Sequence, residues 1–103
     1  MENIWMNKDL EVINGRVEVL FKNLPQTMYR INIVDDRFSQ TYKFFMDIKS
    51  KDQKIKSMPL HVVKTYDLDY LEQLLNKLRK QTTLPFNFEG FQGKIWPCSK
   101  KSV

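Results

Sequence analysis

The spacing of apolar residues changes once along this chain, and that change limits the folds open to it. Up to about Tyr66 apolar and polar residues alternate, which is the period of β-strands. From Asp67 to about Gln81 apolar residues recur every three or four positions, which is the period of an α-helix. A sheet with one apolar face needs a cover, and such a helix supplies it. The pattern predicts an α+β fold: a small antiparallel sheet or partly closed β-barrel of about five to six strands, covered by one main helix.

Length and charge narrow the class of protein. With 103 residues and 42% hydrophobic content the chain is long enough for one core, so we expect a single domain over residues 1–98 and a basic tail at 99–103. A net charge of +5 predicts attraction to polyanions. No apolar run is long enough for a membrane span or a signal peptide, and the lone Cys98 fits a reducing compartment. We therefore expect a cytoplasmic protein with no membrane partner.

The pair Asn14-Gly15 is the strongest local turn signal in the chain. It lies between two alternating runs in the segment Leu10–Phe21, and Asn-Gly is a preferred pair for a two-residue β-hairpin turn. On this interpretation Glu11 and Glu18 oppose each other on the solvent side, where Arg16 relieves their repulsion. The core face of the predicted hairpin consists of Leu10, Val12, Val17 and Val19.

Three further segments alternate in the same way. They are 28–34, 41–48 and 58–66, and Pro59 near the start of the last is typical of an edge strand or of the first residue of a strand. Together with the hairpin they predict four or five strands before the helix. Phe45 falls on the polar face of its strand. The residues expected to face the core in the first two segments are Tyr29, Ile31, Ile33, Tyr42, Phe44, Met46 and Ile48.

The helix is marked at both ends. Asp67 is placed to cap its N-terminus, and Lys77 and Arg79 lie in the last turn, where cations interact favourably with the helix dipole. The aromatic-rich segment 86–96 that follows predicts a hairpin, or a loop and a return strand. Five leucines form the apolar stripe of the helix, which predicts core packing, with a dimer or partner seam as the alternative: Leu68, Leu71, Leu74, Leu75 and Leu78.

The chain offers little catalytic chemistry. His61 and Cys98 are its only histidine and cysteine and lie far apart in sequence, so we interpret His61 as a hydrogen-bonded residue on a strand face. Asp35-Asp36 is typical of a turn, and so is the GxxG sequence at 90–93, because that loop in KH domains joins two helices. The sequence lacks metal-ligand spacing, a Walker A loop and a Rossmann glycine pattern. We therefore expect no enzymatic activity, catalytic residue, metal or cofactor.

Basic residues interleave with aromatic ones between residues 29 and 56. A β-surface that carries both can hold phosphates with its cations and stack unpaired bases on its rings. Residues 42–48 do not satisfy the RNP1 pattern of RNA-recognition motifs, so the prediction depends on surface chemistry. It is a small non-enzymatic regulatory protein that binds RNA or single-stranded DNA. The predicted binding residues are Arg30, Arg37, Lys43, Phe45, Lys49, Lys51, Lys54 and Lys56.

A second function fits the same sequence. Trp5, Phe91 and Trp96 are candidates for exposed interface residues, because aromatic side chains are favoured at interface hot spots. The chain has no alanine and is rich in Lys, Asn, Ile and Phe, a bias typical of A/T-rich coding sequences. The alternative is therefore a protein-interaction or inhibitor protein of a plasmid, phage or low-GC bacterium. A homodimer through a strand edge near Pro59 or through the helix seam also stays open.

Overall fold

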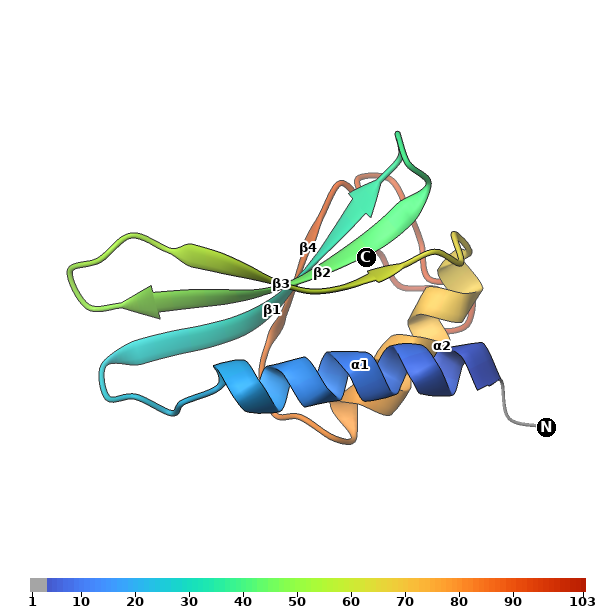
Figure 1. Ribbon diagram of the computed structural model, residues 1–103. Coiled ribbons are helices and arrows are strands. Elements are labelled where there is room, and N and C mark those ends of the chain that lie inside the picture. Colours follow the sequence, from blue (N-terminus) through green and yellow to red (C-terminus); the bar gives the residue numbers. More distant parts are fainter. Residues whose placement is uncertain (1–3) are drawn as a thin grey trace.

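An open sheet with two helices on one side of it makes up the described part of the protein (Figure 1). The computed structural model describes residues 4–103. The strand order is β3-β2-β1-β4; β2 pairs antiparallel with both β1 and β3, whereas β4 runs parallel to β1. Along the chain the elements are α1 (Ile4–Leu20), β1 (Thr27–Asp36), β2 (Thr41–Ser50), β3 (Lys56–Val63), α2 (Leu68–Arg79) and β4 (Phe86–Glu89).

The predicted α+β class is confirmed, but three details of the prediction are wrong. The described residues form four strands rather than five to six, and three rather than four or five precede α2. The sheet is mixed and does not close into a barrel. Two helices cover it rather than one, because the segment predicted as a hairpin is helical.

Residues 4–20 form a single helix, so the hairpin predicted at Leu10–Phe21 is wrong. Val12 and Val19, expected in the core, lie on the exposed side of this helix. The hairpin would also bury four apolar side chains, so the choice depends on which row packs into the common core. The helical row joins one cluster with the sheet and α2, where each buried side chain contributes about 1.5 to 3 kcal/mol, and this packing overrides the turn preference of Asn14-Gly15. The buried row has helical spacing and consists of Met6, Leu10, Ile13 and Val17.

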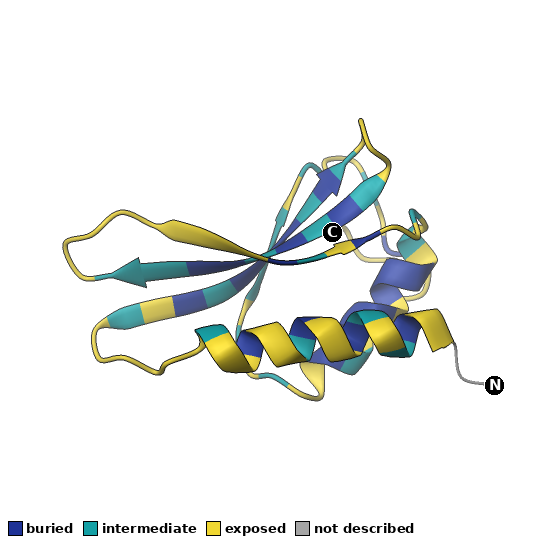
Figure 2. Ribbon diagram, in the orientation of Figure 1, coloured by how far each residue is buried: buried dark blue, intermediate teal, exposed yellow. Residues whose placement is uncertain are grey.

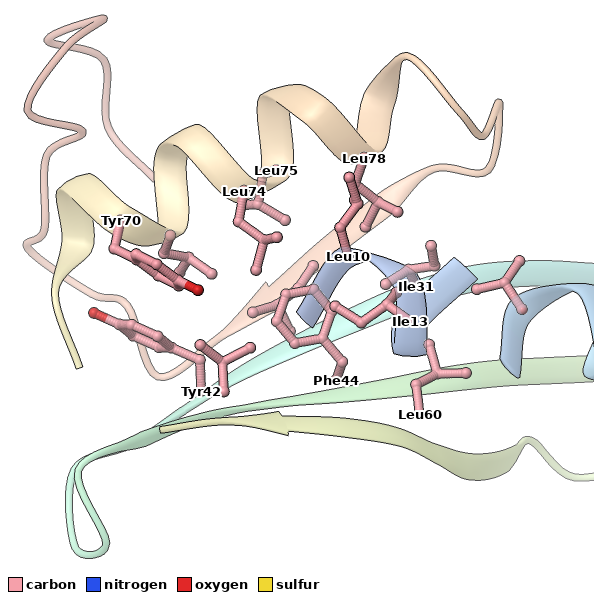
Figure 3. Close-up of a cluster of buried hydrophobic side chains, with 14 of the residues drawn as sticks. Leu10, Ile13, Ile31, Tyr42, Phe44, Leu60, Tyr70, Leu74, Leu75 and Leu78 are labelled. Carbon is pink, nitrogen blue, oxygen red and sulfur yellow. The ribbon is translucent and has the colours of Figure 1, made fainter. Parts of the chain in front are cut away.

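The alternation predicted for β1 and β2 is confirmed. Their inward side chains are buried under the helices (Figures 2 and 3), and the register sets Ile31 opposite Met46 and Ile33 opposite Phe44. β3 is an edge strand, which is one of the two positions expected for Pro59; the other is wrong, because this proline lies inside the strand, beside a β-bulge, and not at its first residue. A proline at an edge leaves the ladder to the next strand intact, because its missing N–H can face away from the sheet.

Helix α2 follows its prediction closely. The carboxylate of Asp67 caps the helix by accepting a hydrogen bond from the backbone N–H of Asp69 at 3.1 Å. The last helical residue is Arg79, two residues before the predicted end. The leucine stripe is core rather than a dimer seam, because four of its leucines are buried in one cluster with side chains of α1 and the sheet (Figure 3): Leu71, Leu74, Leu75 and Leu78.

The chain after α2 forms one parallel strand and an aromatic cluster rather than a hairpin. Phe88 packs edge to face against both Phe91 and Trp96, with ring centroids 5.6 Å apart in each pair. Phe91 and Trp96, expected at an exposed interface, are therefore buried. The expectation failed because this segment folds back over the end of the core, which its own sequence pattern does not reveal.

The last residues of the chain, expected as a basic tail, are held against α2 by a buried carboxylate. Glu72 accepts hydrogen bonds from the backbone N–H groups of Cys98 at 2.7 Å and Ser99 at 3.0 Å. The backbone N–H of Trp96 also donates to the carbonyl of Lys101 at 2.9 Å. Burial opposes ionisation of Glu72, but the two N–H donors hold its pKa below the usual value.

Replacing Gly15 distinguishes the helix from the hairpin. Gly15 lies in the interior of α1, and a Cβ there would meet nothing within 4 Å. We expect Gly15→Ala to raise the free energy of unfolding by roughly 0.5 to 1 kcal/mol, because alanine favours helix over the unfolded chain. In a hairpin turn with positive φ the same change would be destabilising. Urea denaturation followed by circular dichroism measures the difference.

Gly90 is the matched control for that substitution. Its φ is +83°, and a Cβ at this position would lie 2.9 Å from the backbone oxygen of Asp35. We expect Gly90→Ala to destabilise the protein by at least 1 kcal/mol. If both glycines respond in the same direction, the assignment of Gly15 to a helix is contradicted.

The pH dependence of stability tests the Glu72 contact. Because the pKa of Glu72 is lower in the folded state, the ionised carboxylate stabilises the fold above its unfolded pKa, and this contribution is lost as pH falls. We expect Glu72→Gln to lower the urea midpoint at pH 7. The gap between the two proteins should narrow as pH falls below 4.5, the ordinary value for this carboxyl. Tryptophan fluorescence at pH 7, 5 and 3 checks this, and an unchanged gap at pH 3 would contradict it.

Candidate nucleic-acid interface

The sheet face turned away from the helices is uncovered (Figure 1). Arg30 on β1 occupies an outward position there, because side chains alternate along a strand. Lys43, Phe45 and Lys49 occupy outward positions on the neighbouring strand β2. The structure thus places these four predicted residues on one surface, which we call the open face.

Two cations of the open face are already paired with carboxylates. Arg30 Nε lies 3.0 Å from Asp47 Oδ2, and Lys43 Nζ lies 2.7 Å from Asp36 Oδ2. The hydrogen bond from Lys43 is the largest cause that lowers the pKa of Asp36 to about 2. Ser57 on β3 donates to the second oxygen of Asp47 at 2.6 Å. These pairs leave little net positive charge in the middle of the open face.

The lysines of the β2–β3 hairpin, in contrast, are not paired with carboxylates of the described residues. Lys51, Lys54 and Lys56 are exposed, and none has a carboxylate within 4.0 Å among the described residues. Lys49, at the base of the hairpin, donates to the backbone carbonyl of Ser50 at 3.0 Å, which leaves its charge uncompensated. The hairpin extends away from the helices as a double strand (Figure 1). Unpaired positive charge therefore gathers at this end of the sheet.

Arg37 lies apart from that cluster. It occupies the β1–β2 turn, at the opposite end of β2 from the hairpin, and its Nη2 donates to the carbonyl of Gly90 at 3.3 Å. The eight predicted binding residues are therefore distributed over the two ends and the middle of one face. The sequence pattern alone could not divide them into paired and unpaired cations.

Two grooves interrupt the open face. One of about 790 Å³ lies near the β1–β2 turn, and Phe45, Asn32 and Glu89 contribute to its lining. The other, of about 450 Å³, lies toward the hairpin, and Met28 and Ile55 contribute to its apolar lining.

A buried ion pair behind the first groove was missed by the sequence analysis. The carboxylate of Asp35 is fully buried, accepts a hydrogen bond from the Tyr66 hydroxyl at 2.6 Å and forms an ion pair with Lys94. The hydrogen bond to Asp35 is the main cause that raises the pKa of Tyr66. Burial acts against the charge of Lys94, but its pairing with Asp35 raises the Lys94 pKa.

Asp35 was interpreted as a turn residue, yet it is the last inward position of β1. One signal could have shown this: Asp35 follows Tyr29, Ile31 and Ile33 at intervals of two, which places it on the buried face. A carboxylate at an inward position needs a cation or hydrogen-bond donors. Here those groups come from distant parts of the chain.

His61 has the structural role that its position on a strand predicted. Its Nε2 lies 2.6 Å from Asp9 Oδ1 on α1, and the Tyr70 hydroxyl donates to the other oxygen of Asp9 at 2.6 Å. Burial is the main cause that raises the pKa of Tyr70. Cys98 instead contacts Glu72 through its backbone, so the histidine and the cysteine have different partners.

Comparison with known proteins gives this chain no relative, because no family model, curated protein or solved structure matches it. Within residues 4–103 no group of three or more His, Cys, Asp or Glu side chains is arranged to hold a metal ion. Over the same residues, no helix combines the length and apolar character needed to cross a bilayer.

Substitution of Asp35 tests the buried ion pair. We expect Asp35→Ala to reduce the free energy of unfolding by about 2 to 4 kcal/mol, because it leaves Lys94 and Tyr66 without their shared acceptor; the partial exposure of Lys94 moderates the loss. The control is Arg37→Gln, since Arg37 is exposed and its Nε lies 4.0 Å from Asp35. Its effect should stay within about 0.5 kcal/mol. Equal losses in the two variants, measured by urea denaturation, would contradict this assignment.

Proposed function

We propose that this is a small non-enzymatic regulatory protein that binds RNA or single-stranded DNA through the open face and the β2–β3 hairpin. The observation that carries the proposal is the set of hairpin lysines that have no carboxylate partner within residues 4–103: Lys49, Lys51, Lys54 and Lys56.

Whether a cation is already paired with a carboxylate decides how much we expect it to contribute to nucleic-acid affinity. A lysine without a carboxylate partner can pair with a phosphate, and counterions of the nucleic acid are then released into solution, which drives binding. Arg30 and Lys43 would have to share their charge with Asp47 and Asp36, so we expect them to orient the ligand more than to attract it. The hairpin is therefore the expected source of affinity, which refines the face predicted from sequence.

Salt dependence tests the proposal directly. If three or four phosphates are neutralised, the affinity for a single strand should fall about 20- to 50-fold between 50 and 200 mM salt, since each contact contributes a slope of roughly 0.7. Fluorescence anisotropy with labelled single-stranded RNA, single-stranded DNA and duplex DNA measures this. No binding of any of the three at micromolar protein and 50 mM salt would overturn the proposal.

Charge reversal locates the binding element. We expect the double variant Lys51→Glu with Lys54→Glu to weaken binding at least tenfold at 50 mM salt, because it replaces two phosphate contacts by repulsion. The control is Lys64→Glu with Lys80→Glu, which changes the net charge equally at exposed residues outside the hairpin. If the control weakens binding as much as the hairpin variant, only overall charge matters and the hairpin assignment is wrong.

A protein-binding function is the alternative, and one observation favours it. Trp5 on α1 is 69% exposed, next to Ile4 at 68%, and Val12 and Val19 are exposed further along the same helix. An aromatic anchor of this kind would give binding that changes little with salt. Of the three aromatic residues expected at an exposed interface, Trp5 alone supports this function, because Phe91 and Trp96 are buried. A homodimer through the β3 edge near Pro59 stays a prediction.

A further inference from the structure

The larger groove of the open face carries a carboxylate that the fold holds in a defined orientation. Glu89 Oε1 accepts a hydrogen bond from Asn32 Nδ2 at 2.9 Å, and Asn32 Oδ1 accepts one from Asn87 Nδ2 at 2.8 Å. Asn32 is buried, so this chain of contacts is fixed from beneath. Glu89 itself is exposed, and its Oε2 has no hydrogen-bond partner in the described part of the chain. A residue that lines the groove therefore carries a free acceptor beside a held one.

Aromatic side chains flank the same groove. Phe45 is half-buried next to Asn32 in the sheet, and Phe38 at the β1–β2 turn is fully exposed, at 104% of the reference area. The turn that carries Phe38 is held in place, because Asp36 accepts hydrogen bonds from the backbone N–H groups of Phe38 at 3.1 Å and Ser39 at 3.2 Å. Two rings without ring partners thus lie where a flat ligand could stack.

Two basic residues also line this groove. Lys43 contributes to the lining and uses one of its three donors on Asp36, which leaves two for a ligand oxygen. Arg37 lies at the rim. The groove therefore combines a carboxylate, a donor and stacking surfaces in one place.

We propose that this groove binds the base of an unpaired guanine in a single-stranded nucleic acid. This inference rests on the proposed function and adds a base preference to it. Guanine presents two adjacent donors, N1–H and N2–H, which match the two oxygens of the Glu89 carboxylate, and its O6 can accept from Lys43. Adenine and cytosine place an acceptor beside their amino group, and uracil has a single N–H between two carbonyls. None of the three satisfies both carboxylate oxygens.

The same geometry predicts a preference for single-stranded over double-stranded nucleic acid. A base in a duplex has its Watson–Crick edge occupied, so only an unpaired base can present N1–H and N2–H to a side chain. From Lys43 to Lys49 the strand β2 covers about 20 Å. A short single strand could therefore place one base in the groove while its phosphates reach the hairpin lysines.

Anisotropy titrations with eight-nucleotide RNAs test the inference. The probes are oligouridine and the same strand with one central guanine, adenine, cytosine or inosine. We expect the guanine probe to bind the wild-type protein about tenfold more tightly than the adenine, cytosine or uridine probes. Inosine, which lacks the N2 amino group, should lose most of that gain.

Two variants separate base recognition from stacking. Glu89→Gln can still accept the hydrogen bond from Asn32, so the fold should be unaffected, but the preference for guanine should disappear while oligouridine binding changes less than twofold. Phe38→Ala removes a fully exposed ring and should weaken all probes by a similar factor of several-fold. Urea midpoints of both variants, compared with wild type, verify the fold.

The outcomes separate this inference from the proposed function. If the wild-type protein binds all probes with equal affinity, or if the guanine preference survives in Glu89→Gln, the groove assignment is wrong while nucleic-acid binding stands. If no probe binds at 50 mM salt, both are wrong. A guanine preference that is lost in Glu89→Gln and reduced with inosine supports the groove.

Discussion

Burial of a single face of the sheet is the constraint on which the rest of this structure depends. The inward side chains of β1, β2 and β3 form one cluster with the apolar rows of α1 and α2, and each buried side chain contributes about 1.5 to 3 kcal/mol. Both helices pack against that face of the sheet. The other face has no cover of its own, so its exposed polar groups can bond to water and only its buried ones need partners; no buried side-chain N or O atom in residues 4–103 lacks a partner.

Ion pairs on the open face decide which of the chain's positive charges are available to a ligand. A net charge of +5 says only that the chain attracts polyanions, whereas the structure divides its cations by partner. Arg30 and Lys43 are compensated by carboxylates on neighbouring strands, while the lysines of the β2–β3 hairpin are not. Carboxylates on a surface proposed to bind nucleic acid then have a role other than repulsion, since Glu89 can accept hydrogen bonds from a base.

Polar contacts between distant segments hold the C-terminal part of the chain on this core. Asp35 with Lys94, and Glu72 with the backbone of Cys98 and Ser99, join residues separated by 59, 26 and 27 positions. Their patterns do not appear in the local sequence, because each partner is an ordinary surface residue type until the fold brings the two together. The inward position of Asp35 was readable from the period of β1, but its partner was not.

The sequence by itself determined the elements whose local pattern and burial agree: the alternation of β1 and β2, and the capped leucine helix α2. It also determined the overall charge and which residues of β2 face outward. Tertiary structure decided that residues 4–20 are a helix: the segment carries both a row of helical spacing from Met6 to Val17 and the turn pair Asn14-Gly15, and packing against the sheet and α2 selects the helical row. It also decided the parallel addition of β4, the burial of Phe91 and Trp96, and which cations are free, since each of these depends on which distant segments meet.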